Sequence, residues 1–118
     1  MNILTYAYLG DAIYELYIRK FLISKNIVKV DLLQKESIKY VSAKAQAKFL
    51  KEMIDNNFLT EEEIDIVKRA RNHKSHASKS TDIVTYKHST GLEALIGYLY
   101  MDNKQTRIDE IMNYIMEV

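Results

Sequence analysis

Residues 89–101 read STGLEALIGYLYM, and Glu93 is the only charged residue among them. Because the chain contains no proline and this run is so apolar, the stretch predicts a helix over about residues 89–102. An ionised carboxylate on such a helix is energetically expensive unless it is paired or binds a metal ion. The stretch therefore predicts an apolar core helix and marks Glu93 as a candidate functional residue.

The remaining chain also favours helices. Residues 3–22 have apolar residues at helical spacing, namely Gly10, Ile13, Tyr14, Tyr17, Ile18 and Phe21. After a connection over 23–29, a helix is predicted from an Asp31 N-cap to Tyr40. The next is predicted from a Ser42 cap to Asn56-Asn57, with Ala43, Ala47, Leu50 and Ile54 on one side. Further helices are predicted over 60–71, which a Thr60–Glu63 capping box begins, over a short 81–87 segment, and over 105–117. Residues 72–80 lack apolar periodicity and predict a surface loop. The 118 residues are thus expected to form one all-α domain, 1–118.

Composition excludes several classes of protein. The chain has no cysteine, which excludes disulfides, thiolate metal sites and a cysteine nucleophile. No run of 18 apolar residues occurs, so no membrane partner is expected. The N-terminus has no basic region before its apolar stretch, so we expect no signal peptide and a cytoplasmic location.

Positive charge is concentrated in one segment. Residues 68–88 contain six Lys or Arg and one acid, a net +5, and since the whole chain is +1 the rest is −4. Such a patch indicates an anionic partner such as nucleic acid, although a simple solvated loop remains an alternative. The candidate phosphate- and ribose-contacting residues are Lys68, Arg69, Arg71, Asn72, Lys74, Ser75, Lys79 and Lys87. The three histidines of this segment fit no zinc-ligand spacing.

The three glycines lie beside two carboxylates. Gly10 precedes Asp11, and Gly91 and Gly97 flank Glu93. Each glycine weakens a helix by about 1 kcal/mol relative to alanine, so their placement indicates helices whose backbones must approach closely. We therefore expect Asp11 and Glu93 to converge.

Converging carboxylates without matching cations form a hard oxygen site suited to Mg²⁺, with Mn²⁺ as an alternative ion. Glu15 follows Asp11 by one helical turn, and Arg19 follows Glu15 by another. A salt-bridged stripe along this helix, with no metal, is the competing interpretation of the same spacing.

Two motifs carry a resemblance to a known family. Residues 8–12, YLGDA, resemble the core of the ribonuclease III signature, and residues 93–97, EALIG, resemble its second motif, in the same order. The short chain, with RARN at 69–72, KS at 74–75 and YKHST at 86–90, is similar to the bacterial Mini-ribonuclease III family. The resemblance implies a ribonuclease III endonuclease-domain-like helical bundle with no double-stranded-RNA-binding domain.

The resemblance also implies an activity. It assigns Asp11 and Glu93 as catalytic metal ligands, double-stranded RNA as substrate, a homodimer as the assembly, the 23S ribosomal RNA precursor stem as target, and a ribosomal protein as a further partner. Full-length ribonuclease III has additional carboxylates at the positions of Ala7 and Thr90. Glu15 and Thr90 are therefore candidates to support a site with fewer ligands.

We hypothesise metal-assisted phosphodiester hydrolysis, with Lys74 and its neighbours holding the duplex. One alternative is a catalytically weak or inactive ribonuclease III-fold module that binds RNA or dimerises. Others are a helical adaptor with no role in nucleic-acid binding, and a double-strand-specific ribonuclease with no ribosomal preference.

Overall fold

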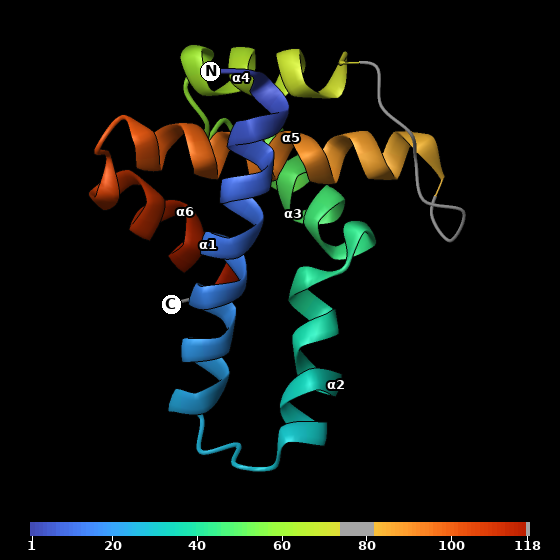
Figure 1. The fold of residues 1–118 in the computed structure, drawn as a ribbon, viewed down its shortest axis with the longest axis vertical. Coiled ribbons are helices and arrows are strands. Elements are labelled where there is room, and N and C mark those ends of the chain that lie inside the picture. Colours follow the sequence, from blue (N-terminus) through green and yellow to red (C-terminus); the bar gives the residue numbers. More distant parts are fainter. Residues whose placement is uncertain (74–81, 118) are drawn as a thin grey trace.

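The chain folds into six packed helices (Figure 1), as seen in a computed structural model that describes residues 1–73 and 82–117. The helices are α1 (Ile3–Ser24), α2 (Val30–Val41), α3 (Ala43–Asp55), α4 (Glu61–Arg71), α5 (Ile83–Met101) and α6 (Gln105–Met116). No strand occurs within the described ranges, so the predicted all-α class is confirmed. None of these six helices combines the length and the apolarity needed to cross a bilayer. Most of the predicted surface loop, residues 74–80, lies outside the described residues.

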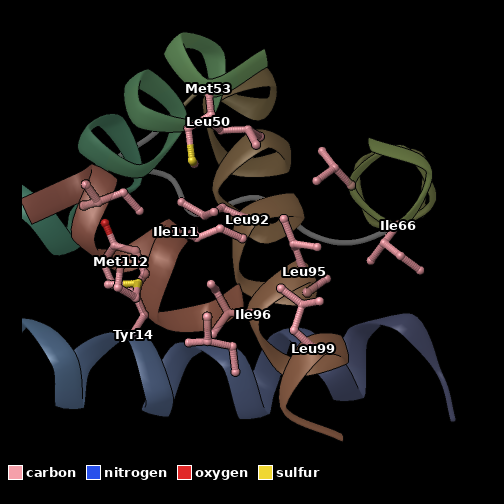
Figure 2. Close-up of a cluster of buried hydrophobic side chains, with 14 of the residues drawn as sticks. Tyr14, Leu50, Met53, Ile66, Leu92, Leu95, Ile96, Leu99, Ile111 and Met112 are labelled. Atoms are coloured by element: carbon pink, nitrogen blue, oxygen red, sulfur yellow. The ribbon is translucent and has the colours of Figure 1, made fainter. Parts of the chain in front are cut away.

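Helix α5 is the core of the bundle and packs against α1, α3, α4 and α6. Figure 2 shows Leu92, Leu95, Ile96 and Leu99 of α5 among buried side chains of the surrounding helices. Leu92, Leu95 and Ile96 are completely buried. Burying one such side chain stabilises the fold by roughly 1.5–3 kcal/mol, which explains why this apolar run forms the core helix.

Helices α1 and α5 cross at two glycines with almost no space between their backbones. A Cβ built on Gly10 would lie 1.7 Å from the carbonyl oxygen of Glu93, and one built on Gly97 would lie 1.9 Å from that of Tyr6. The predicted close approach is therefore confirmed for both residues. Gly91 differs, because its Cβ would meet Val67 Cγ1 of α4 at 3.0 Å. The prediction that all three glycines bring the acids together was wrong for Gly91.

The buried face of α1 includes Gly10, Tyr14 and Ile18 as predicted, but it is rotated away from the other three predicted residues. Its buried residues are Ile3, Ala7, Gly10, Tyr14, Ile18 and Leu22. Ile13, Tyr17 and Phe21 are only partly buried and line a surface groove of about 630 Å³. The glycine crossing fixes the rotation of α1, and these three apolar side chains consequently remain accessible.

Helices α2 and α3 confirm one predicted cap and correct another. Ser42 caps α3, and its Oγ accepts from the Ala45 N–H at 3.1 Å. The N-cap of α2 is Lys29 rather than Asp31, and Asp31 lies in the first turn, where a negative charge favours the helix dipole. The buried residues of α3 are Gln46, Leu50 and Met53, so the predicted apolar side of this helix was also misplaced. Leu50 is common to both sets.

Helix α5 is continuous where two helices had been predicted. Asp82 caps it by accepting from the Thr85 N–H at 2.9 Å. The hydroxyl groups of Ser89 and Thr90 donate to the Tyr86 carbonyl at 2.9 and 3.0 Å. These bonds satisfy the polar side chains inside the helix, so the separation of 81–87 from 89–102 was wrong.

The capping box of α4 is confirmed and carries an additional ion pair. Thr60 and Glu63 exchange hydrogen bonds of 2.9 and 3.1 Å between side chain and backbone. Arg107 of α6 donates from Nε to Glu63 Oε2 at 2.7 Å and from Nη2 to the Phe58 carbonyl at 2.7 Å. The same residues that start α4 therefore join it to α6.

Candidate active site

Asp11 and Glu93 meet at the crossing of α1 and α5. Asp11 directly follows Gly10, whose backbone touches the Glu93 carbonyl. The side-chain carboxyl group of Glu93 interacts with that of Asp11 through a hydrogen bond and through charge. Asp11 is exposed and Glu93 is partly buried, so the pair reaches the surface. The structure thus brings together two acids that the sequence places far apart.

The environment of Glu93 disfavours its charged form. Its pKa is raised to about 8, first by burial and then by the hydrogen bond and the charge of Asp11. The charge of Glu15 acts in the same direction, whereas a hydrogen bond from Gln46 acts against it. No lysine or arginine in the described part of the chain forms an ion pair with either acid. The two neighbouring carboxyl groups therefore form a site whose negative charge is not neutralised by a lysine or arginine of the described residues.

The donor set fits a hard divalent cation. Carboxylate oxygens are the ligands that Mg²⁺ prefers, and this ion usually keeps several of its waters. Within residues 1–73 and 82–117 no group of three or more His, Cys, Asp or Glu side chains is close enough to hold a metal ion. The two acids Asp11 and Glu93 nevertheless fit a metal ion whose coordination is completed by water, because Mg²⁺ is usually bound by one or two carboxylates.

Glu15 lies near this pair but is engaged elsewhere. Its Oε2 accepts from Arg19 Nε at 3.4 Å, so the predicted contact between Glu15 and Arg19 is present. Asp11 takes no part in that ion pair, and the salt-bridged stripe is therefore incomplete. Glu15 can influence Glu93 through its charge.

Thr90 lies one turn before Glu93 on α5. Its side chain is buried, and its hydroxyl donates to the Tyr86 carbonyl at 3.0 Å. The hydroxyl therefore satisfies the backbone of its own helix. Ala7, one turn before Asp11, is also buried and offers no ligand atom.

Two neighbours of the acids were missed in the sequence. Gln46 of α3 is only 2% exposed, and its side chain hydrogen-bonds Glu93. Tyr14 is completely buried, and its hydroxyl donates to the Tyr40 carbonyl at 2.7 Å. Burial, then the charges of Glu93 and Glu15, raise the pKa of Tyr14 well above its ordinary value. The one sequence feature that could have indicated this neighbour is a polar residue, Gln46, one helical turn before the apolar Leu50.

The basic residues occupy the end of α4 and the start of α5. Lys68 and Arg69 are exposed, while Arg71 and Lys87 are partly buried. Arg71 lines a cavity of about 600 Å³ with residues of α3 and α5, among them His88. Asn72 is the C-cap of α4, and with Arg69 and the N-terminal residues it lines a second cavity of about 420 Å³. Lys74, Ser75 and Lys79 lie outside the described residues.

Comparison with known proteins decides the family. A model of the Ribonuclease III domain matches residues 4–104, which include both acids. The chain belongs to the ribonuclease III domain family. It is therefore a ribonuclease-type hydrolase by family, and the sequence-based recognition is confirmed.

Several known proteins are similar to this chain over nearly all of its length. Mini-ribonuclease 3 of Brevibacillus brevis is 50% identical over 112 residues, covering 94% of this chain and 82% of that protein. Mini-ribonuclease 3 of Enterococcus faecalis is 44% identical over 118 residues, covering 99% and 89%. A protein of Fusobacterium nucleatum, solved by X-ray crystallography, has 37% identity and a TM-score of 0.89, covering 99% of this chain and 94% of its own. Fold and family thus agree with the sequence motifs.

Proposed function

We propose that the chain is a Mg²⁺-dependent, double-strand-specific endoribonuclease whose catalytic domain spans residues 1–118. Asp11 and Glu93 are its metal ligands and catalytic residues, with Mn²⁺ as an alternative ion. The observation that supports this assignment is the contact between two carboxyl groups that no cation of the described residues neutralises. A bound divalent ion would activate water for attack and stabilise charge on the scissile phosphate.

The protein contributes the geometry of the two ligands. The Gly10–Glu93 contact fixes the distance between α1 and α5, and Asp11 and Glu93 are attached directly at that contact. A raised pKa means that Glu93 must lose a proton to become a ligand, so metal binding would release protons near neutral pH. The same crowding that disfavours two negative charges in the free protein favours a dication between them.

The basic segment is the proposed RNA-binding surface. Lys68 and Arg69 are exposed at the end of α4, where they can contact phosphates. Arg71, Asn72 and Lys87 extend the same surface, with Lys74, Ser75 and Lys79 as further candidates. Duplex RNA is recognised mainly by its shape, phosphates and 2′-hydroxyl groups, which suits a surface of basic and small polar side chains.

The proposed substrate in the cell is the stem of the 23S ribosomal RNA precursor, in the cytoplasm and with a ribosomal protein as an additional partner. This finer assignment is supported by the similarity to proteins named Mini-ribonuclease 3. A double-strand-specific ribonuclease without ribosomal preference would cleave unrelated duplexes equally well. Comparison of a precursor stem with a duplex of scrambled sequence separates the two.

The proposed assembly is a homodimer formed through the exposed apolar face of α1. Leu9, Ile13 and Leu16 line the groove of about 630 Å³, and Leu16 is 58% exposed. Tyr8 on the same helix is 84% exposed. Apolar side chains grouped on one helix indicate a protein interface, and a second copy would bring two sites together because Asp11 lies on that helix. Leu16→Glu should convert the dimer to a monomer in light scattering.

Cleavage of a duplex RNA by purified protein, with and without Mg²⁺, tests the function. Asp11→Asn should lose at least about 100-fold in cleavage rate while retaining its helical content and RNA binding. Calorimetric titration should show Mg²⁺ binding to the native chain and none to the variant. A native chain that binds duplex RNA but never cuts it would instead support the non-catalytic RNA-binding alternative.

A further inference from the structure

Gln46 is a buried polar side chain on an otherwise apolar helix face. It is 2% exposed, and the other buried residues of α3, Leu50 and Met53, are completely buried and apolar. A buried amide is unfavourable unless its donor and acceptor groups are hydrogen-bonded. Among the described residues, no side-chain nitrogen or oxygen that is fully shielded from solvent lacks a hydrogen-bond partner.

The partner of Gln46 is the carboxyl group of Glu93. Two features determine this contact. Ser42 begins α3, and the Gln46 N–H donates to the Ser42 carbonyl at 3.0 Å, so Gln46 lies in the first turn of the helix. Helix α3 packs directly against α5, the helix that carries Glu93. Glu93 is therefore held at its backbone by Gly10 of α1 and at its side chain by Gln46 of α3.

A neutral amide is a better hydrogen-bond partner than a cation for a carboxylate that has to bind a metal ion. A lysine or arginine at this place would form an ion pair with Glu93 and would compete with a metal ion for the carboxylate. A glutamine N–H occupies one lone pair with a neutral donor and leaves the negative charge and the other lone pairs available. Hydrogen bonds from neighbouring groups to a metal ligand fix its orientation and contribute to metal affinity.

We propose that Gln46 is a positioning residue, whose side-chain amide holds the Glu93 carboxylate in the orientation in which it binds the metal ion together with Asp11. This inference rests on the proposed function of these two acids. Orientation matters more in this chain than in a site with four carboxylates, because Ala7 and Thr90 supply no ligand atom. Each of the two remaining ligands must therefore be placed accurately.

The test replaces Gln46 by methionine, which has a similar shape and no hydrogen-bonding amide. In Gln46→Met the calorimetric dissociation constant for Mg²⁺ should rise about 10–100-fold, and the Mg²⁺ concentration for half-maximal cleavage should rise in parallel. The maximal rate at saturating Mg²⁺ should recover, and RNA binding without metal should not change. Gln34→Met on α2, an exposed position, is the matched control and should behave as the native chain in every assay.

Unchanged Mg²⁺ affinity in a folded Gln46→Met variant would overturn the proposal. If that variant does not fold, the native chain still provides a test through NMR of its side-chain amides. The Gln46 amide signal should be displaced from that of Gln34 in metal-free protein, and Glu93→Ala should abolish the displacement; a Gln46 signal unaffected by Glu93→Ala overturns the proposal. Loss of the proposed function looks different, since Asp11→Asn and Glu93→Gln would then leave Mg²⁺ binding and cleavage unchanged.

Discussion

The carbonyl oxygen of Glu93 occupies the space that a side chain on Gly10 would need. A Cβ there would lie 1.7 Å from this oxygen and 2.9 Å from the Gly97 nitrogen, and both neighbours belong to backbone that cannot rotate away. The distance between α1 and α5 is therefore set by the absence of a side chain at position 10. Because Asp11 is the next residue, the contact also determines how closely the two carboxyl groups approach.

Gly10→Ala should consequently damage stability and activity together. We expect a loss of about 3 kcal/mol in the free energy of unfolding, because the new methyl group must force two helices apart. Cleavage by the folded fraction should also fall, since separation of α1 from α5 separates the proposed ligands. Urea denaturation and single-turnover cleavage measure the two effects.

Gly91→Ala is the control for this prediction. Its Cβ would meet Val67 Cγ1 at 3.0 Å, and a side-chain atom can move more easily than a backbone. Removal of a helical glycine also contributes up to about 1 kcal/mol of stability. Gly91→Ala should thus lose less stability than Gly10→Ala and keep its activity; equal losses would contradict the role assigned to the Gly10 contact.

The raised pKa of Glu93 predicts an unusual dependence of stability on pH. An unfolded glutamate titrates near 4.5, and in the metal-free fold Glu93 titrates at about 8, first because it is buried and then because of Asp11. Between these values the folded chain binds a proton that the unfolded chain has lost, so stability decreases as pH rises through this range. Glu93→Gln removes this titration and resembles the protonated acid in shape.

We therefore expect Glu93→Gln to be as stable as the native chain at pH 5 and more stable at pH 9, by on the order of 2 kcal/mol in the absence of metal. Denaturation curves in a chelating buffer at the two pH values measure this difference. Added Mg²⁺ should stabilise the native chain and not the variant, which should also fail to cleave RNA. Identical pH profiles for the two proteins would show that Glu93 does not titrate as described.

The contact between Glu63 and Arg107 predicts the opposite behaviour in acid. Burial acts to raise the pKa of Glu63, but the hydrogen bonds from Arg107 and Thr60 outweigh it and hold the pKa below its usual value. This group therefore contributes stability above about pH 4.5, and the contribution is lost as pH falls through the lowered pKa. Glu63→Gln should destabilise the fold by about 3 kcal/mol at pH 7 and by much less near pH 3.

Glu110→Gln is the matched control, because Glu110 accepts from the same arginine at 3.2 Å but is 56% exposed. Solvent screens such a pair, so its loss should change stability by less than about 1 kcal/mol at either pH. If Glu110→Gln lost as much stability as Glu63→Gln, the stabilising contact of Arg107 would not be specific to Glu63.

The features that could be predicted from the sequence are those with a local cause. The Ser42 cap and the Thr60–Glu63 box depend on residues three apart, and the glycine placement revealed the α1–α5 crossing. Gln46 could not be recognised, because its role depends on α3 packing beside a residue that is distant in the chain. The continuous start of α5 was missed because the predicted break at residue 88 has no local cause in the fold, where the hydroxyl groups of Ser89 and Thr90 donate to the Tyr86 carbonyl across it.

The exposed cations at the end of α4 predict how RNA binding responds to salt. Each phosphate that a lysine or arginine neutralises releases counterions, so the logarithm of the binding constant falls linearly with the logarithm of salt concentration. Lys68→Ala and Arg69→Ala should each weaken duplex binding and should each reduce the steepness of that dependence by about 1. Binding is measured by fluorescence anisotropy in the Asp11→Asn background, where the RNA stays intact.

The control for this surface is Lys35→Ala on α2, a lysine that is also exposed but lies outside the basic segment. If the partner were recognised by net charge alone, loss of any one of these cations would have a similar effect. If the end of α4 contacts the phosphates, Lys35→Ala leaves the salt dependence unchanged while the α4 variants flatten it. If Lys35→Ala and Lys68→Ala changed the salt dependence equally, the end of α4 would not be the RNA-binding surface. That result would leave the metal-binding assignment of Asp11 unaffected, because calorimetry measures it separately.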